Sequence, residues 1–179
     1  WVSKNEEVFA VSHYGVPKFD IEKWQLEITG LVNHPKTLSL ADLKARRRKS
    51  VTATLECSGN GAGPAFMGAI GNVKWTGTPL APLLKECGLK ERGIEVVFFG
   101  TDEKTEKIRD KDYTQNFARS LSRGDAFRDD IILAYEMNGE PLPKEHGAPF
   151  RLIVPVWFGF TWVKWLARIE ELDRRYMHR

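Results

Sequence analysis

A cysteine at the start of a glycine-rich stretch is the residue of this chain best placed for chemistry. Cys57 follows residues 51–56, where apolar and polar residues alternate as in a half-buried strand, and it precedes the glycine-rich residues 58–64. Loops at the ends of strands commonly carry catalytic and binding groups. The residues alone leave three interpretations of Cys57 open: a buried structural thiol, a nucleophile that needs a base such as His13 or His146, or a ligand to a soft metal. Because one thiolate cannot hold a first-row metal alone, the third interpretation requires a metal whose other ligands belong to a cofactor.

A second group of residues is suited to binding an anion. His146 precedes Arg151 by five positions, and Lys164 lies in the tryptophan-rich residues 162–165. A planar guanidinium binds phosphate oxygens through two parallel hydrogen bonds, so Arg151 and His146 together suit a phosphate or a similar anion. In this interpretation Lys164 contacts the same anion. In the structural alternative, His146 caps a turn, Arg151 pairs with a carboxylate and Lys164 extends its charge into solvent. Both interpretations remain open at the level of the residues.

Strands and short helices must position these groups. Alternating or β-branched apolar runs predict strands, a capping box at Ser39–Asp42 predicts the start of one helix, and apolar residues at i, i+3, i+4 and i+7 predict another. Asn138-Gly139 predicts a tight hairpin turn. Irregular alternation of the elements favours an α+β domain with a mixed sheet over a doubly wound fold. The predicted strands cover residues 24–30, 51–56, 94–99, 131–137, 150–154 and 163–169, the helices cover 39–49 and 78–87, and the polar residues 101–130 are predicted as surface loops with one helical turn.

The composition excludes several classes of protein. Of the 179 residues, 42% are hydrophobic and 28% are charged, which is too apolar for a disordered chain and predicts a single domain over residues 1–179. No apolar run approaches the about 20 residues that a membrane-spanning helix needs. The net charge of +3 requires neither nucleic acid nor a membrane as partner. The basic run Arg46–Lys49 has no interleaved aromatic residues, so it is predicted as a solvated helix end rather than a nucleic-acid patch.

The cysteines and the N-terminus say little about the compartment. The two cysteines cannot form a disulfide framework, and neither has a second cysteine or a histidine at zinc-ligand spacing. Cys87 lies on the apolar face of the predicted 78–87 helix and is expected to be an inert core residue. Residues 1–7 are polar and do not resemble an export signal, but a mature exported protein without its leader would look the same. The compartment is therefore left open between an exported one, such as the periplasm, and the cytoplasm.

Four stretches of the chain carry a family resemblance. Leu55–Asn60 contains the cysteine, Gly71–Leu80 follows shortly after it, Leu133–Pro143 continues into His146–Arg151, and Val163–Leu166 closes the set. In this order they resemble the signatures of the sulfite oxidase family of molybdopterin enzymes. The resemblance covers roughly residues 8 to 170, and as a set the motifs are highly specific. It implies the mixed-sheet α+β molybdenum-cofactor domain known as the sulfite oxidase fold.

The resemblance also implies a cofactor and its binding residues. Cys57 corresponds to the one protein ligand of molybdenum, and the cofactors implied are molybdenum and molybdopterin. The pterin's own dithiolene then supplies further sulfur ligands, and its phosphate accounts for converging basic side chains. The residues that correspond to cofactor-contacting positions are Phe9, His13, Asp102, His146, Arg151, Trp162, Val163 and Lys164.

The activity implied is oxygen-atom transfer by a molybdenum-dependent oxidoreductase. In a sulfite oxidase-like reaction, a small oxyanion or sulfoxide is the substrate, and electrons pass to an external acceptor such as a cytochrome. The alternatives are a sulfoxide reductase-type molybdoenzyme, a cysteine hydrolase based on Cys57, and a non-enzymatic module that binds an anion or a partner through Arg46–Lys49. The family's immunoglobulin-like dimerisation domain and a haem attachment site are not encoded in these residues, which indicates a fragment or a reduced member of the family.

Two departures from the family pattern concern the substrate. Sulfite oxidases carry an arginine beside the metal where this chain has Val11, and a second basic residue where it has Gly61 and Ala62. A buried anion without paired cations is disfavoured, so the sequence predicts weak turnover of sulfite or a neutral substrate such as a sulfoxide. If the substrate is nevertheless an anion, Arg119 and Arg123 are the nearest candidate cations.

Overall fold

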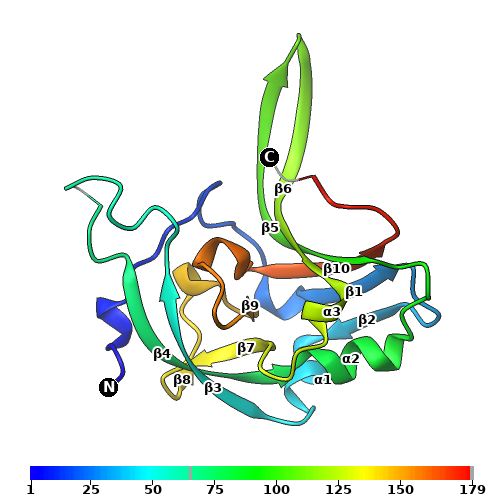
Figure 1. The fold of residues 1–179 in the computed structure, drawn as a ribbon, viewed down its shortest axis with the longest axis horizontal. Helices are drawn as coiled ribbons and strands as arrows, with labels where there is room; N and C mark the ends of the chain where they lie inside the picture. Colours follow the sequence, from blue (N-terminus) through cyan, green and yellow to red (C-terminus); the bar gives the residue numbers. More distant parts are fainter. Residues whose placement is uncertain (65, 178–179) are drawn as a thin grey trace.

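The computed structural model describes residues 1–64 and 66–177, which form two β-sheets connected by short helices (Figure 1). The α-helices are α1 Leu40–Lys44, α2 Leu80–Cys87 and α3 Arg123–Ala126, and the 3-10 helices are η1 Asn5–Glu7, η2 Ile21–Lys23, η3 Lys144–His146 and η4 Gly159–Thr161. The strands are β1 Gln25–Gly30, β2 Lys36–Ser39, β3 Lys49–Glu56, β4 Ile70–Pro79, β5 Glu95–Ile108, β6 Lys111–Ser122, β7 Ile132–Met137, β8 Glu140–Pro141, β9 Arg151–Ile153 and β10 Leu166–Leu172.

The first sheet is mixed, as the sequence predicts. Its strand order is β2-β1-β10-β5-β6, and β1 runs parallel to β10 whereas the other neighbours are antiparallel. Ile28 pairs with Ile169 in the parallel ladder, so strands from the two ends of the chain lie side by side. The C-terminal part of the chain is thereby anchored against the N-terminal strand.

The second sheet carries the cysteine loop at one end. Its order is β3-β4-β7-β8, and β9 also pairs with β7. β7 and β8 are joined by Asn138 and Gly139, which both have positive φ (54° and 87°), so the predicted hairpin turn is confirmed. β3 ends at Glu56, and the next residue is Cys57.

A common hydrophobic core lies between the two sheets. It includes Trp75 and Leu133 of the second sheet, Ile169 of the first, and the apolar face of α2. Cys87 on that face is fully buried, as predicted for an inert core thiol. Among the described residues, no helix is long and apolar enough to cross a membrane.

The prediction of surface loops over residues 101–130 is wrong. Most of this stretch forms β5 and β6, a long antiparallel hairpin whose distal end projects away from the rest of the molecule (Figure 1). In the distal part both faces meet solvent, so charged residues occupy both and no apolar alternation marks the strands. Cross-strand contacts such as the hydrogen bond between the Thr105 and Thr114 hydroxyls (2.7 Å) hold the register. The helical turn predicted in this stretch is α3.

Two element boundaries also differ from the prediction. The capping box of Ser39 and Asp42 forms, but α1 ends at Lys44, and the basic run Arg46–Lys49 follows it instead of ending the helix. The last strand begins at Leu166 rather than at residue 163, because Trp165 has a left-handed backbone (φ 47°) that interrupts an extended chain. Lys164 is consequently not part of a strand.

Candidate functional site

A cleft lies where the N-terminal segment, the cysteine loop, the turn before β9 and the stretch around η4 meet. The space between its walls, counting the open mouth, is about 740 Å³. Val163 does not line the cleft; it is buried in the core, where its carbonyl accepts from the Leu152 N–H (2.8 Å), and its cofactor role stays a prediction. The cleft is lined by all the other residues predicted for the site, namely Phe9, His13, Cys57, Asp102, His146, Arg151, Trp162 and Lys164.

Cys57 is held at the end of β3 by its own loop. Its N–H donates to the carbonyl of Ala69 (3.0 Å), and its carbonyl accepts from the N–H of Asn60 (2.9 Å). The Asn60 side chain bridges the loop, because its Nδ2 donates to Glu56 and its Oδ1 accepts from the Ala69 N–H. Gly61 has φ of 82°, a conformation that glycine adopts without steric cost. The half-buried, unbridged thiol of Cys57 thus faces the cleft on a defined turn.

Arg151 is a buried cation without an acidic partner among the described residues. Its side chain is 3% exposed, and its Nη atoms donate to two backbone carbonyls, those of His146 (2.9 Å) and Trp162 (3.1 Å). Its Nε is buried without a partner, and its guanidinium lies 4.9 Å from the centre of the Trp75 ring. An aromatic face stabilises a cation without neutralising it. The predicted structural alternative, a pair with a carboxylate, is therefore wrong, and the charge of Arg151 is left for a ligand.

Gly147 brings Lys164 and His146 up to this arginine. It has φ of 109°, and a Cβ there would lie 2.9 Å from Cβ of Lys164 and 3.1 Å from Cβ of Arg151, closer than side chains pack. Lys164 Nζ donates to the Glu145 carbonyl (2.8 Å) and lies 4.2 Å from the centre of the Trp165 ring. The backbone thus packs two cations and a histidine against one wall of the cleft.

The pKa values of Arg151, Lys164 and His146 are all lowered, as expected for buried basic groups when neighbouring negative charges do not offset the cost of burial. Burial lowers the pKa of Arg151 to about 9, and burial together with the Arg151 charge lowers the pKa of Lys164 to about 7. The same two causes lower the pKa of His146 to about 4. Each shift means that the protein disfavours the positive form. A bound anion would oppose all three shifts, so the wall is electrostatically suited to a phosphate.

Asp102 adds a buried acceptor to the same cleft. It is 4% exposed, its Oδ1 has no hydrogen-bond partner, and burial raises its pKa to about 6. It lies in the irregularity of the β5–β6 ladder between Phe99 and Glu103. A buried carboxylate oxygen without a partner is costly, so an N–H donor on a ligand would relieve it.

The N-terminal segment forms another part of the cleft lining, and its lining residues Phe9–His13 include no arginine. The His13 ring stacks on Phe117 with centroids 4.7 Å apart, and burial, followed by the charges of Arg119 and Lys164, lowers its pKa. Val11 also lines the cleft and is 41% exposed. This wall is therefore apolar at the position where the family resemblance implies a cation.

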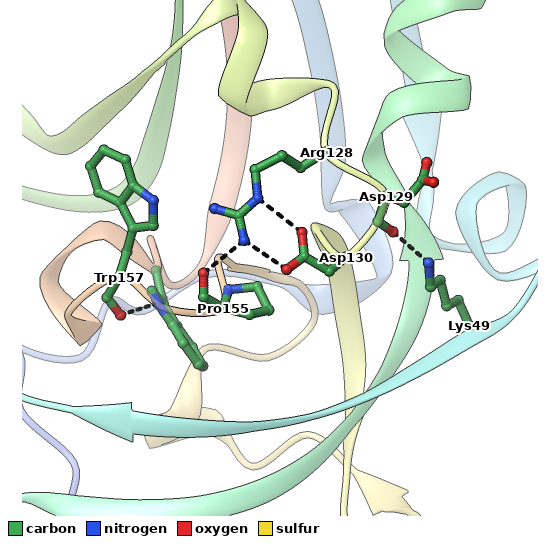
Figure 2. A network of polar contacts seen from close by, with 7 residues as sticks. Lys49, Arg128, Asp129, Asp130, Pro155 and Trp157 are labelled. Carbon is green, nitrogen blue, oxygen red and sulfur yellow. Dashed lines mark hydrogen bonds and ion pairs between the residues drawn. The ribbon is translucent and has the colours of Figure 1, made fainter.

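A clamped loop holds the aromatic side of the cleft. Figure 2 shows the Arg128 guanidinium bound to both oxygens of Asp130 (3.1 and 2.7 Å) while it also donates to the carbonyl of Pro155 (3.1 Å). The indole N–H of Trp162 donates to the carbonyl of Trp157 (3.0 Å). Between these two anchors Val156 has φ of 67°, which a β-branched residue adopts only where its surroundings enforce it. The loop and the neighbouring Gly159–Thr161 turn are thus kept in one position.

Arg123 and the basic run Arg46–Lys49, which were also candidates from the sequence, do not line the cleft. Arg123 lies 3.6 Å from buried Glu171 and donates to backbone carbonyls before β5, so it is a structural residue away from the cleft. In the run Arg46–Lys49, Arg46 pairs with Glu86 and Arg48 with Glu136, both at 2.6 Å. Lys49 donates to the carbonyl of Asp129 (Figure 2). Two of the four cations of the basic run are therefore neutralised by acids.

Several lining residues were missed from the sequence. Phe117 lay in the stretch predicted as loops, where no alternation marked its strand. Trp75 is a core residue rather than a lining residue; it lay in a family motif, but only the fold shows that its ring supports Arg151. The other lining residues not predicted individually are Ala10, Ser12, Leu55, Ser58, Gly159, Phe160 and Trp165.

Comparison with known proteins identifies the family. Residues 13–179 match the family described as the oxidoreductase molybdopterin binding domain. The chain belongs to this family. It is 36% identical over 182 residues to the mitochondrial sulfite oxidase of Drosophila melanogaster, covering 95% of this chain and 31% of that protein. It is 35% identical over 187 residues to NADH nitrate reductase 2 of Phaseolus vulgaris, covering 94% and 21%.

A solved structure shares the fold of this molybdopterin-binding domain. The sulfane dehydrogenase SoxCD from Paracoccus pantotrophus matches with a TM-score of 0.80 and 33% identity, covering 92% of this chain and 42% of that one. The chain thus spans about a third of the sulfite oxidase and less than half of the SoxCD chain. The predictions of a molybdopterin-binding domain of the sulfite oxidase family and of its α+β fold are confirmed.

The residues of the cleft fit a molybdopterin. The uncompensated cations, with the buried Arg151 Nε, suit its phosphate, and the orphaned Asp102 oxygen suits its N–H groups. Throughout residues 1–64 and 66–177, no three His, Cys, Asp or Glu side chains converge so as to hold a metal ion. The thiol of Cys57, which lines the cleft, is suited to a soft metal that arrives with further ligands of its own.

Proposed function

We propose that residues 1–179 act as one molybdopterin-binding domain that catalyses oxygen-atom transfer in a sulfite oxidase-like reaction. The observation that carries the proposal is the buried Arg151, whose charge meets carbonyls and an aromatic ring but no acid among the described residues, in the same cleft as an unbridged cysteine. A cation in that position is costly unless an anion joins it.

Each part of the cleft has a distinct task in this proposal. Cys57 ligates the metal, while Arg151, His146 and Lys164 hold the phosphate and Asp102 accepts from the pterin. When bound, the cofactor supplies a two-electron redox centre that can give or take an oxygen atom. The protein orients the cofactor through binding residues that come from separate elements. The close approach at Gly147 holds Lys164 next to Arg151, and the Asn60 bridge holds the loop of Cys57.

The remaining residues shape the space in front of the metal ligand. Phe117, Phe160 and Trp162 form an aromatic wall, and the anchors at Pro155 and Trp157 hold the loop beside it. Such a wall excludes bulk water and strengthens electrostatic interactions inside the cleft.

For a sulfite-like substrate the balanced overall reaction is simple. The substrate takes one oxygen atom that ultimately comes from water, and two protons and two electrons are released. The electrons leave to an external acceptor such as a cytochrome. Burial lowers the pKa of Lys164 to about 7, so Lys164 is a cleft group able to exchange a proton near neutral pH.

A sulfoxide reductase-type reaction is the second candidate. The observation that favours it is Val11, an exposed apolar residue that lines the cleft where an anion would need a cation. The same aromatic wall would accept the apolar substituents of a neutral sulfoxide. A non-enzymatic module built on Arg46–Lys49 is not favoured, because Arg46 and Arg48 are paired with acids.

Metal analysis combined with steady-state kinetics tests the proposal. Protein purified from a host that makes the cofactor should contain molybdenum and pterin in equal amounts, close to one per chain. The loaded protein should oxidise sulfite with ferricyanide as acceptor, or reduce a sulfoxide with a viologen donor. Loaded protein that turns over neither class would refute the proposed reaction, and protein without molybdenum would refute the cofactor assignment.

A further inference from the structure

Arg119 is a cation that β6 places on the cleft side of the sheet. Alternate residues of a strand share a face, so Phe117, Arg119 and Leu121 lie on one side of β6. Phe117 lines the cleft and Leu121 is buried in the core. Arg119 does not itself line the cleft; it lies along β6 between the lining residue Phe117 and the core residue Leu121, and its side chain is only partly exposed.

Two aromatic rings of the cleft wall hold the Arg119 guanidinium. Its central carbon lies 4.3 Å from the centre of the Phe117 ring and 5.6 Å from that of Phe160. Its Nη1 donates to the carbonyl of the adjacent Ala118 (2.6 Å). Its charge is felt in the cleft: the lining residue His13 stacks on the same Phe117 ring (4.7 Å), and Arg119 contributes to lowering the pKa of His13.

No carboxylate faces Arg119 in the part of the chain that the structure describes. Burial lowers its pKa, and the groups that oppose this shift are the hydroxyls of Tyr14 and Tyr176. Arg168 offers a contrast on the same sheet: it also lies over a phenylalanine, Phe99 (4.0 Å), but it is paired with Glu170 at 3.8 Å. An arginine that lies over an aromatic ring can therefore still pair with an acid, as Arg168 does.

We propose that Arg119 is a specificity-determining residue that attracts and retains an anionic substrate, an oxyanion such as sulfite, at the mouth of the cleft. It supplies from β6 the charge that Val11 does not supply from the N-terminal wall. A cation held between low-dielectric aromatic rings at a cleft mouth raises the local concentration of anions and binds them through several N–H donors. This inference rests on the proposed function, and it selects the anionic substrate over the neutral sulfoxide.

The test compares Arg119→Gln with Arg92→Gln in the molybdenum-loaded protein. Arg92 is an exposed cation in the turn before β5, whereas Arg119 lies over the lining residues Phe117 and Phe160, so replacing Arg92 removes the same charge away from the cleft wall. In Arg119→Gln we expect the KM for sulfite to rise about tenfold or more, kcat per molybdenum to change less than about twofold, and the salt dependence of kcat/KM to weaken. Arg119→Lys should recover most of the lost affinity, and Arg92→Gln should behave as wild type.

A binding measurement without turnover separates this inference from the proposed reaction. Calorimetric titration of the loaded protein with sulfate, an unreactive oxyanion, should give a Kd that Arg119→Gln weakens about as much as it raises the KM. If sulfate binds Arg119→Gln and wild type equally, or if the sulfite KM is unchanged, the role of Arg119 is refuted while the proposed reaction stands. If wild type binds sulfate through Arg119 but oxidises no sulfite, the proposed reaction fails and the anion site remains.

Discussion

Replacing Arg151 by methionine should have opposite consequences for cofactor retention and for the stability of the empty protein. Methionine matches the length of the arginine stem and removes the charge. In the empty protein, the change relieves the desolvation of an ion, a penalty of several kcal/mol, but it removes two hydrogen bonds to carbonyls of about 1.5–3 kcal/mol each. It also removes the contact with Trp75, worth about 2 kcal/mol when desolvated. These effects oppose one another, so we expect the free energy of unfolding to change by less than about 3 kcal/mol.

In the loaded protein there is no such compensation. The loss of one or two charged hydrogen bonds to the phosphate, at about 1.5–3 kcal/mol each, weakens cofactor binding at least about tenfold, since 1.4 kcal/mol is a factor of ten. The assay is the molybdenum and pterin content after extensive dialysis, together with urea unfolding of the cofactor-free protein.

Arg48→Met is the matched control, because Arg48 is a largely exposed arginine whose pair with Glu136 should contribute about 0–1 kcal/mol. It should leave cofactor content unchanged. The reasoning is refuted if Arg151→Met retains the cofactor as wild type does. It is also refuted if the empty variant loses more than about 4 kcal/mol, because Arg151 would then be mainly a structural residue.

Three further predictions follow from the same site. Cys57→Ser should keep the circular dichroism spectrum and the cofactor-free Tm of wild type but lose turnover, and equal turnover would contradict the ligand role of Cys57. The pKa of Lys164 is about 7 in the folded protein against an ordinary 10.5. Between these pH values the folded protein has released a proton that the unfolded chain keeps, so the contribution of Lys164 to stability rises with pH across that window. Lys164→Met should therefore flatten the rise in cofactor-free Tm from pH 7 to 10, and an unchanged profile would exclude Lys164 as its source. Val11→Arg should lower the KM for sulfite severalfold at unchanged molybdenum content, and no change would show that the apolar wall does not limit anion binding.

Local patterns predicted the elements that carry the site. The alternation before Cys57, the Asn138-Gly139 turn and the apolar face of α2 each depend on residues close in sequence, and each formed as expected. The family motifs added the residues that meet only in the fold. His13, Cys57 and His146 are far apart along the chain, yet they line one cleft.

What the sequence did not predict depends on long-range packing. The distal β5–β6 hairpin has solvent on both faces, so no apolar periodicity distinguished it from a loop, and Phe117 and Arg119 went unplaced with it. The sequence pattern placed Lys164 in a strand, but the left-handed conformation of Trp165 starts the strand later. That conformation depends on tertiary contacts that the pattern does not reveal, such as the hydrogen bond from the Thr101 N–H to the Trp165 carbonyl (2.9 Å). Trp75 could not be recognised as the partner of Arg151 before the sheets were assembled.

X-ray absorption at the molybdenum edge tests the central claim most directly, namely that this chain holds molybdenum through Cys57. The pterin's dithiolene provides two sulfur atoms, so the loaded wild-type protein should show three sulfur neighbours of molybdenum, and Cys57→Ser should show one fewer. Only two sulfur neighbours in wild type, or the same sulfur count in both proteins, would contradict the assignment of Cys57 as the metal ligand.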